Sequence, residues 1–148
     1  DNWNGGIMIE QKFNLITLGV KDLQRSIKKK KKGLGWKRSS QSQESVAFFQ
    51  LTGIVLSLFS RDSLALDAQV SSAGSGFSGF TLAYNTRSEK EVDDIFIFIE
   101  KIGGTIIKKP SKVFWGGYSG YFSDPDGFLI EVAYNPFFEM DENGLLKI

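Results

Sequence analysis

One carboxylate stands out in an apolar strand near the C-terminus of the chain. Glu131 follows residues 124–127, Asp-Pro-Asp-Gly, which have the composition of a tight turn because proline presets φ and glycine tolerates a positive φ. Side chains alternate along a strand, so Glu131 shares a face with Leu129 and Ala133. A carboxylate among such residues is costly to bury without a partner. Glu131 therefore lies either at the wet edge of a sheet or in a functional site.

Two roles remain open for Glu131. In a cleft, the carboxylate would orient a ligand or act as a general base, and this makes Glu131 the candidate catalytic residue. In the alternative, it is a structural carboxylate paired with a neighbouring donor or with water.

A segment rich in aromatic residues and glycines, residues 114–121, precedes the same turn. Glycines allow a loop to approach a ligand, and Trp115, Tyr118 and Tyr121 would then form a stacking wall with hydroxyl groups. Alternatively, the segment is a bulged strand entry whose aromatic rings belong to the core. Arg61 and Asp62 likewise have two interpretations, as contacts for an anionic ligand at a cleft rim or as a surface ion pair.

The composition excludes several kinds of chemistry. The 148 residues contain no histidine and no cysteine, so imidazole catalysis, thiolate metal sites and disulfides are excluded. The net charge of +1 gives no argument for nucleic acid or a membrane surface, and the lysine run 28–32 has no interleaved aromatic pattern for reading bases. No apolar run approaches the roughly 20 residues of a membrane span. We expect a cytoplasmic protein that binds neither nucleic acid nor membrane.

The first half of the chain reads as strand, helix and three short strands. Alternation predicts a strand over 13–20, and Asp22 is placed to cap a helix. Lys30 falls on the apolar stripe of that helix, so it must snorkel or the helix must weaken near its C-terminus. Glycines at 33 and 35 end the helix. The predicted strands that follow are 36–39, 46–51 and 54–59.

The second half repeats this order. A strand over 80–84 precedes Ser88 and Glu91, which form a capping box at the start of an apolar-faced helix. Gly103 and Gly104 stop the helix, and the predicted strands that follow are 105–108, 118–122 and 128–134. Residues 141–144 have turn chemistry that predicts a short C-terminal hairpin.

The order β-α-β-β-β thus occurs twice, which predicts an α+β fold of two βαβββ modules in one domain. We expect a flexible leader and strand entry at 1–12, a first module at 13–61, a linker at 62–78, a second module at 79–138 and a tail at 139–148. The aliphatic face of each sheet should pack under its helix. The opposite face is mixed and aromatic and suits a half-open ligand cleft. The expected ligand-binding residues are Ser57, Phe59, Phe80, Tyr84, Trp115, Tyr118, Tyr121 and Glu131.

Four motifs in this order resemble the vicinal oxygen chelate superfamily, the group of glyoxalase I, extradiol dioxygenases and bleomycin-resistance proteins. They are 16–23 (Ile-Thr-Leu-Gly-Val-Lys-Asp-Leu), 33–36 (Gly-Leu-Gly-Trp), 79–82 (Gly-Phe-Thr-Leu) and the turn 124–127 followed by Glu131. The resemblance covers about residues 13–138. It implies two modules whose curled sheets form a cleft, a small-molecule ligand and a homodimer.

The resemblance also implies four positions for the ligands of a divalent metal, at Leu15, Ser57, Phe80 and Glu131. Only Glu131 is a strong ligand, whereas Zn²⁺, Ni²⁺ or Fe²⁺ needs three or four good donors. We therefore expect no cofactor and no metal of the usual kind.

Three functions follow from this departure from the family pattern. The first is binding of a small organic ligand in an aromatic cleft without a metal. The second is a lyase, isomerase or dioxygenase of the glyoxalase type that uses Glu131 with an unconventional metal site. The third is a cleft filled by its own side chains, with a structural or interaction role.

Overall fold

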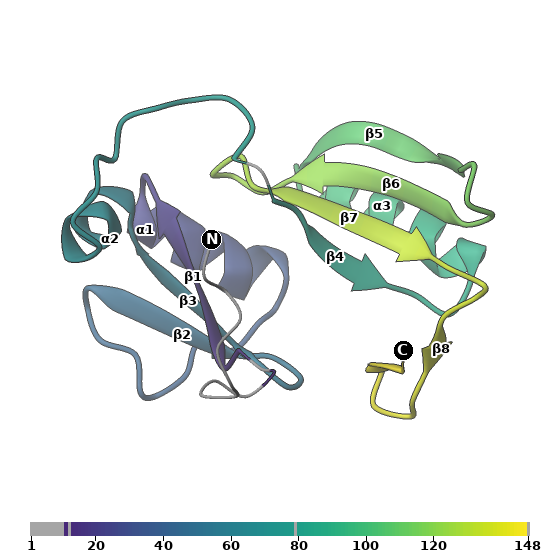
Figure 1. The fold of residues 1–148 in the computed structure, drawn as a ribbon, viewed down its shortest axis with the longest axis horizontal. Helices are drawn as coiled ribbons and strands as arrows, with labels where there is room; N and C mark the ends of the chain where they lie inside the picture. The colour runs from purple at the N-terminus through teal and green to yellow at the C-terminus, as the bar shows by residue number, and fades with distance from the viewer. Residues whose placement is uncertain (1–10, 12, 79, 148) are drawn as a thin grey trace, which may run out of the picture.

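The fold consists of two main sheets, connected by a short helix and an irregular segment, and a small C-terminal hairpin (Figure 1). The computed structural model describes residue 11, residues 13–78 and residues 80–147. The predicted leader 1–12, apart from Gln11, and Gly79 of the predicted second module lie outside the described residues. The α+β class predicted from the sequence is confirmed, with mixed, curled sheets.

The first half contains β1 (Leu15–Val20), α1 (Leu23–Lys28), β2 (Val46–Gln50) and β3 (Val55–Ser60). Its sheet has the order β1-β3-β2, in which β1 is parallel to β3 and β2 is antiparallel to it. Asp22 caps α1 as predicted, accepting a hydrogen bond from the Arg25 amide at 3.0 Å. The core between this sheet and α1 contains the buried residues Leu18, Val20, Ile27, Ala47, Phe49, Leu56 and Leu58.

The second half contains β4 (Leu82–Asn85), α3 (Glu89–Lys101), β5 (Thr105–Lys112), β6 (Tyr118–Ser123) and β7 (Leu129–Tyr134). Its sheet has the order β4-β7-β6-β5 and lies in front of α3 in the view of Figure 1. Ser88 caps this helix as predicted, since the Glu91 amide donates to Ser88 Oγ at 3.1 Å. The Glu91 carboxylate reaches back one residue further than in a capping box and accepts from the Arg87 amide at 2.9 Å. Val92, Phe96 and Val132 form the buried core of this half.

The predicted strand 36–39 is wrong, because this segment has no strand structure. The amide of Phe48, which a neighbouring strand would use, donates instead to Ser42 Oγ at 2.9 Å. Trp36 is held by the end of the helix, where its amide donates to the Lys30 carbonyl at 3.0 Å. Gly35 has a φ of +72°, which breaks the extended path before Trp36. The first half is therefore one strand short of the predicted module.

The segment 62–78, predicted as a linker, begins inside a helix that the sequence analysis missed. This helix, α2 (Arg61–Asp67), starts at Ser60, whose Oγ accepts from the Ser63 amide at 3.4 Å. The strand predicted at 80–84 begins only at Leu82. The predicted C-terminal hairpin is present as β8 (Glu139–Met140) and β9 (Leu146–Lys147).

Of the two outcomes expected at Lys30, a snorkelling side chain or a helix altered near its C-terminus, the structure has the second. The regular helix ends at Lys28 and continues as a wider π-helical turn, η1 (Lys29–Gly33). Lys30 lies in that turn with only 5% of its surface exposed, and its Nζ is 3.7 Å from Asp124 Oδ2. The helix changes near its C-terminus, as the sequence indicates, but the lysine points inward to a partner in the other half of the chain.

The turn between β6 and β7 joins the two halves. Ser26 Oγ donates a hydrogen bond to Asp126, and Arg25 Nη2 donates to the Pro125 carbonyl at 3.2 Å. Phe128, just after the turn, packs against the core of the first half. Figure 1 shows this turn extending from the second sheet toward α1.

No helix in the described ranges is both long enough and apolar enough to span a membrane.

Candidate functional site

A hollow of about 430 Å³ lies on the face of the second sheet that α3 does not cover. Val132 packs toward α3, so the alternation of β7 turns Glu131 to the opposite face. The hollow is lined by Lys108, Lys112, Val113, Phe114, Trp115, Ser119, Tyr121 and Glu131. Its volume is within the range of small-molecule sites in proteins.

Three side chains of different chemistry form a row across β5, β6 and β7. Lys108 is the register partner of Tyr121, and Tyr121 is the register partner of Glu131. Directly opposed residues on neighbouring strands point to the same face and contact one another. An ammonium group, a phenol and a carboxylate thus share one face of the hollow.

Burial raises the pKa of Tyr121, and the charge of Glu131 together with a hydrogen bond to its carboxylate raises it further. The phenol therefore stays protonated at neutral pH and acts as a hydrogen-bond donor. Protonated Tyr121 next to Glu131 forms a donor–acceptor pair facing a half-open space, which is suited to holding a polar group of a ligand.

The irregular path of β5 places Lys108 in this row. The register of β5 against β6 shifts between Ile106 and Lys108 and again between Lys108 and Ser111. Pro110 lies in the second shift and has no amide hydrogen for the sheet. Gly120 of β6 faces this bulge, where a Cβ would lie 2.7 Å from the Lys108 carbonyl oxygen. The bulge and the glycine together allow β5 to approach β6 beside the hollow.

Aromatic side chains form the mouth of the hollow. Trp115 is half-buried, whereas Phe114 is fully exposed. Gly116 and Gly117 shape this turn: Gly116 has a φ of +93°, and a Cβ at Gly117 would overlap the Trp115 ring. The indole therefore packs directly over a glycine.

The structure brings together three of the predicted site residues, Trp115, Tyr121 and Glu131. Tyr118 lies on the other face of β6, where its hydroxyl donates to Asp93 Oδ1 of α3 at 2.6 Å. That hydrogen bond raises the pKa of Tyr118, so this phenol also stays neutral. The segment 114–121 thus contains both of the predicted alternatives, a wall of the hollow and a contribution to the core.

The remaining predicted residues do not line this hollow. Ser57 is buried in the first sheet between Thr17 and Phe48, its register partners, and Phe59 is half-buried in the same strand. Phe80 precedes β4 and packs against the ring of Phe128 in a tilted arrangement, with the ring centroids 5.9 Å apart. Tyr84 is 59% exposed on the edge strand β4.

The residues at the four family positions do not fit a divalent metal. Leu15 and Phe80 have no donor atom, and Ser57 offers only a buried neutral hydroxyl. Within residues 11, 13–78 and 80–147, no three His, Cys, Asp or Glu side chains are grouped so as to hold a metal ion.

Sequence reasoning missed Lys108, Lys112, Val113, Phe114 and Ser119 as lining residues of the hollow. The alternation of side chains along a strand could have identified Ser119, because it lies two residues from Tyr121 on the same strand. No sequence pattern could have identified Lys108, because its position depends on the bulge at Pro110.

Arg61 and Asp62, predicted as a surface ion pair or an anion contact, do not pair with each other among the described side chains. Arg61 Nε donates instead to the Ser72 carbonyl at 3.1 Å.

Solved structures with the same fold are numerous. A glyoxalase-related enzyme from Fulvimarina pelagi is 30% identical to the chain with a TM-score of 0.82, over 93% of this chain and 98% of the other. A glyoxalase/bleomycin resistance protein/dioxygenase from Nocardioides is 22% identical with a TM-score of 0.72, over 86% of both chains. A lactoylglutathione lyase from Agrobacterium tumefaciens is 19% identical with a TM-score of 0.65, over 84% of this chain and 94% of the other.

Among curated proteins, none matches the chain significantly. A family profile nevertheless matches residues 12–132, which is most of the chain. The chain therefore belongs to the Glyoxalase/Bleomycin resistance protein/Dioxygenase superfamily.

Proposed function

We propose that the protein binds a small organic molecule with an aromatic ring in the hollow around Tyr121 and Glu131, without a metal ion. The observation that carries this proposal is the row Lys108–Tyr121–Glu131 facing a cavity of about 430 Å³. The row offers a cation, a protonated hydroxyl and a carboxylate, and the indole of Trp115 offers a surface for stacking.

The aromatic rings at the mouth of the hollow indicate that the proposed ligand has an apolar or aromatic part. Phe114 is fully exposed in the free chain, and water is a poor environment for a phenyl ring. A ligand ring, or a second copy of the chain, would cover it. We include in the proposal a homodimer that closes the hollow, and a cytoplasmic location in keeping with the absence of cysteine.

The test uses Trp115 as a reporter. Intrinsic fluorescence is followed while benzylamine, benzoate, phenylalanine or benzyl alcohol is added to dialysed protein in EDTA. We expect at least one compound to quench wild type and to leave Trp115→Phe unaffected. A hydrogen bond between Glu131 and a charged ligand group contributes about 1.5–3 kcal/mol to the binding free energy. Glu131→Gln should therefore weaken binding of benzylamine or phenylalanine about 10-fold or more.

Trp36 packs against Phe49 in the first half and does not line the hollow, so Trp36→Phe is the matched control. Quenching that survives in Trp115→Phe and is lost in Trp36→Phe would contradict the proposal. So would the absence of quenching by all four compounds. Tight, stoichiometric binding of Ni²⁺, Zn²⁺ or Fe²⁺ to dialysed protein in calorimetry would contradict the proposal that the protein works without a metal ion.

The second candidate is an enzyme of the glyoxalase type, a lyase, isomerase or dioxygenase, with Glu131 as the general base. The specific observation in its favour is the protonated Tyr121 beside that carboxylate, since an acid and a base lie next to each other. Turnover of methylglyoxal with glutathione by wild type and its loss in Glu131→Gln would support this candidate. Equal rates in the two proteins would exclude Glu131 as the base.

A further inference from the structure

A second hollow lies at the end of the first sheet, where two parallel strands finish side by side. Val20 of β1 and Ser60 of β3 are register partners, so the next residues along each strand, Lys21 and Arg61, leave the sheet next to each other. The crevice outside the carboxyl ends of parallel strands is a common ligand site in open sheets.

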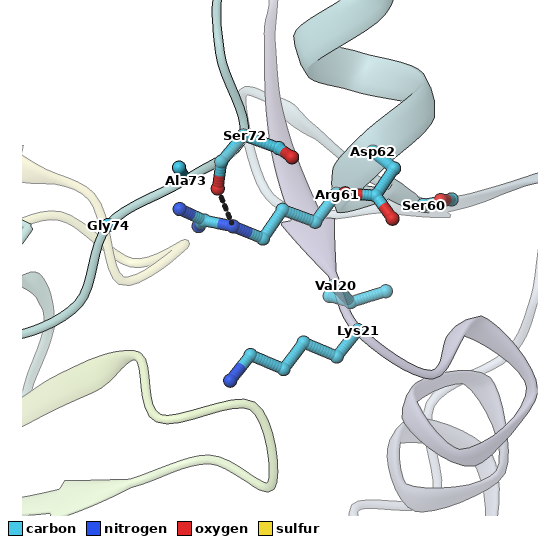
Figure 2. Close-up of a pocket in the computed structure, with 8 residues that line it drawn as sticks. All are labelled: Val20, Lys21, Ser60, Arg61, Asp62, Ser72, Ala73 and Gly74. Carbon is cyan, nitrogen blue, oxygen red and sulfur yellow. Dashed lines mark hydrogen bonds between the residues drawn. The ribbon is translucent and has the colours of Figure 1, made fainter.

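The space between these strand ends and the linker has a volume of about 310 Å³. It is lined by Val20, Lys21, Ser60, Arg61, Asp62, Ser72, Ala73 and Gly74. Figure 2 shows that the side chains of Lys21 and Arg61 extend toward the same side, whereas the Asp62 carboxylate is turned away from the guanidinium. Two positive groups therefore face one hollow.

The guanidinium of Arg61 is held in place by the linker. Its Nε donates to the Ser72 carbonyl at 3.1 Å, which leaves both terminal amino groups of the planar fork directed away from that bond (Figure 2). In the part of the chain that the structure describes, neither Lys21 nor Arg61 forms a salt bridge with a carboxylate. The two cations are thus not held in an ion pair by a described carboxylate, although Asp62 adds one negative charge to the lining.

Gly19 fixes the position from which Arg61 projects. A Cβ at Gly19 would lie 3.0 Å from Arg61 Cα and 3.2 Å from Leu64 Cδ2. The start of α2 therefore rests directly on the backbone of β1, and this contact brings Arg61 beside Lys21. The arrangement of the two cations is built into the packing of the first half.

We propose that this hollow binds a small oxyanion, a phosphate group or a carboxylate, between Lys21 and Arg61. The planar fork of Arg61 suits two oxygens of one anion, and the ammonium of Lys21 supplies a second positive charge. The hollow belongs to the first sheet and shares no lining residue with the hollow at Glu131, so this proposal stands apart from the proposed function.

The test is calorimetric titration with inorganic phosphate and, separately, with acetate, at an ionic strength held constant with sodium chloride. We expect phosphate to bind wild type with one site and Arg61→Gln to weaken it about 10-fold or more, because a bidentate charge-assisted pair is lost. Lys21→Gln weakens it less, since the lysine acts as a single point charge. Lys37→Gln, at an exposed lysine outside the hollow, is the matched control and leaves the affinity unchanged.

Arg61→Lys separates charge from geometry, because it keeps the charge and loses the fork, and its affinity falls between wild type and Arg61→Gln. Acetate that competes with phosphate would extend the site to carboxylates, and acetate that does not would restrict it to phosphate groups. No saturable binding of either anion to wild type would overturn the proposal. Equal affinities in Arg61→Gln, Lys21→Gln and Lys37→Gln would also overturn it, and Lys21→Gln decides the question alone if the Arg61 variants do not fold.

Discussion

Asp124 illustrates how one residue serves both a turn and a contact between distant parts of the chain. Its Oδ1 accepts hydrogen bonds from the amides of Asp126 and Phe128, both at 2.9 Å, and so closes the turn. Its Oδ2 faces Lys30 Nζ at 3.7 Å, with both side chains almost fully buried. The turn composition was readable from the sequence, but the partner was not, because Lys30 lies in a lysine run that resembles a solvated surface.

The pH dependence of stability tests this environment. Burial raises the pKa of Asp124 above its ordinary value of 3.8, although Lys30 and the two amides act in the opposite direction. The folded state therefore holds the proton more tightly than the unfolded state. The contribution of Asp124 to the free energy of unfolding should fall as pH rises from 3.8 through the folded-state pKa.

Urea denaturation of wild type and Asp124→Asn over that pH range measures the effect. The stability of wild type relative to the variant should be greatest at the acid end. A difference that stays constant with pH would contradict the raised pKa.

At the scale of elements, the sequence was most informative where a local signal acts alone. The Asp22 cap, the Ser88 cap and the C-terminal hairpin all formed as predicted. The prediction failed at 36–39 because the Ser42 side chain takes the amide of Phe48, a contact that no periodicity reveals. It also missed α2, whose Leu64 packs near Gly19, a contact between residues that are far apart in sequence.

Gly120 lies where β5, β6 and α3 pack closely together, so we expect a side chain at this position to destabilise the protein. A Cβ there would lie 2.7 Å from the Lys108 carbonyl oxygen and 2.8 Å from Phe96 Cζ. Overpacking of this kind typically costs about 1–3 kcal/mol, so Gly120→Ala should lower the free energy of unfolding by that amount.

Gly33→Ala is the matched control, since its Cβ would make an ordinary contact of 3.7 Å with Ile102 Cδ1. Denaturation curves of the two variants provide the comparison. Equal stabilities would show that the bulge at Pro110 does not constrain Gly120.

At the scale of the whole molecule, the two halves are linked by polar contacts from α1 and η1 to a single turn. Ser26 and Arg25 contact the turn residues 125–126, and Lys30 contacts Asp124. Phe128 adds an apolar contact to the core of the first half. The sequence predicted the fold class and the second module, but neither the missing strand of the first half nor that the turn 124–127 would hold the halves together.

A double-mutant cycle measures this link. Removing one partner of a buried ion pair leaves the other charge uncompensated, so Lys30→Met and Asp124→Asn should each lower the free energy of unfolding by about 3–5 kcal/mol. The double variant should lose less than the sum of the two, because no unpaired charge remains buried.

The exposed pair Lys90–Asp94, at 2.7 Å on α3, is the control, and its cycle should show little coupling. Additive losses at Lys30 and Asp124 would mean that the two side chains do not act as a pair.

The candidate site shows the same division between local and distant information. Trp115, Tyr121 and Glu131 were predicted from their types and their alternation, and they line one hollow. Lys108 lines the hollow only because of a register shift, which spacing along the chain does not reveal. Tyr118 lies three residues from Tyr121 on the same strand, so alternation places it on the opposite face, where it bonds to Asp93.

The central claim is that this hollow binds an aromatic ligand without a metal, and backbone amide NMR in EDTA tests it most directly. Benzylamine and phenylalanine, added separately to isotopically labelled protein, should shift the amide signals of Lys108, Trp115, Ser119, Tyr121 and Glu131, and the shifts should diminish in Glu131→Gln. No shifts at these residues, or shifts that appear only when EDTA is replaced by Zn²⁺ or Ni²⁺, would contradict the account.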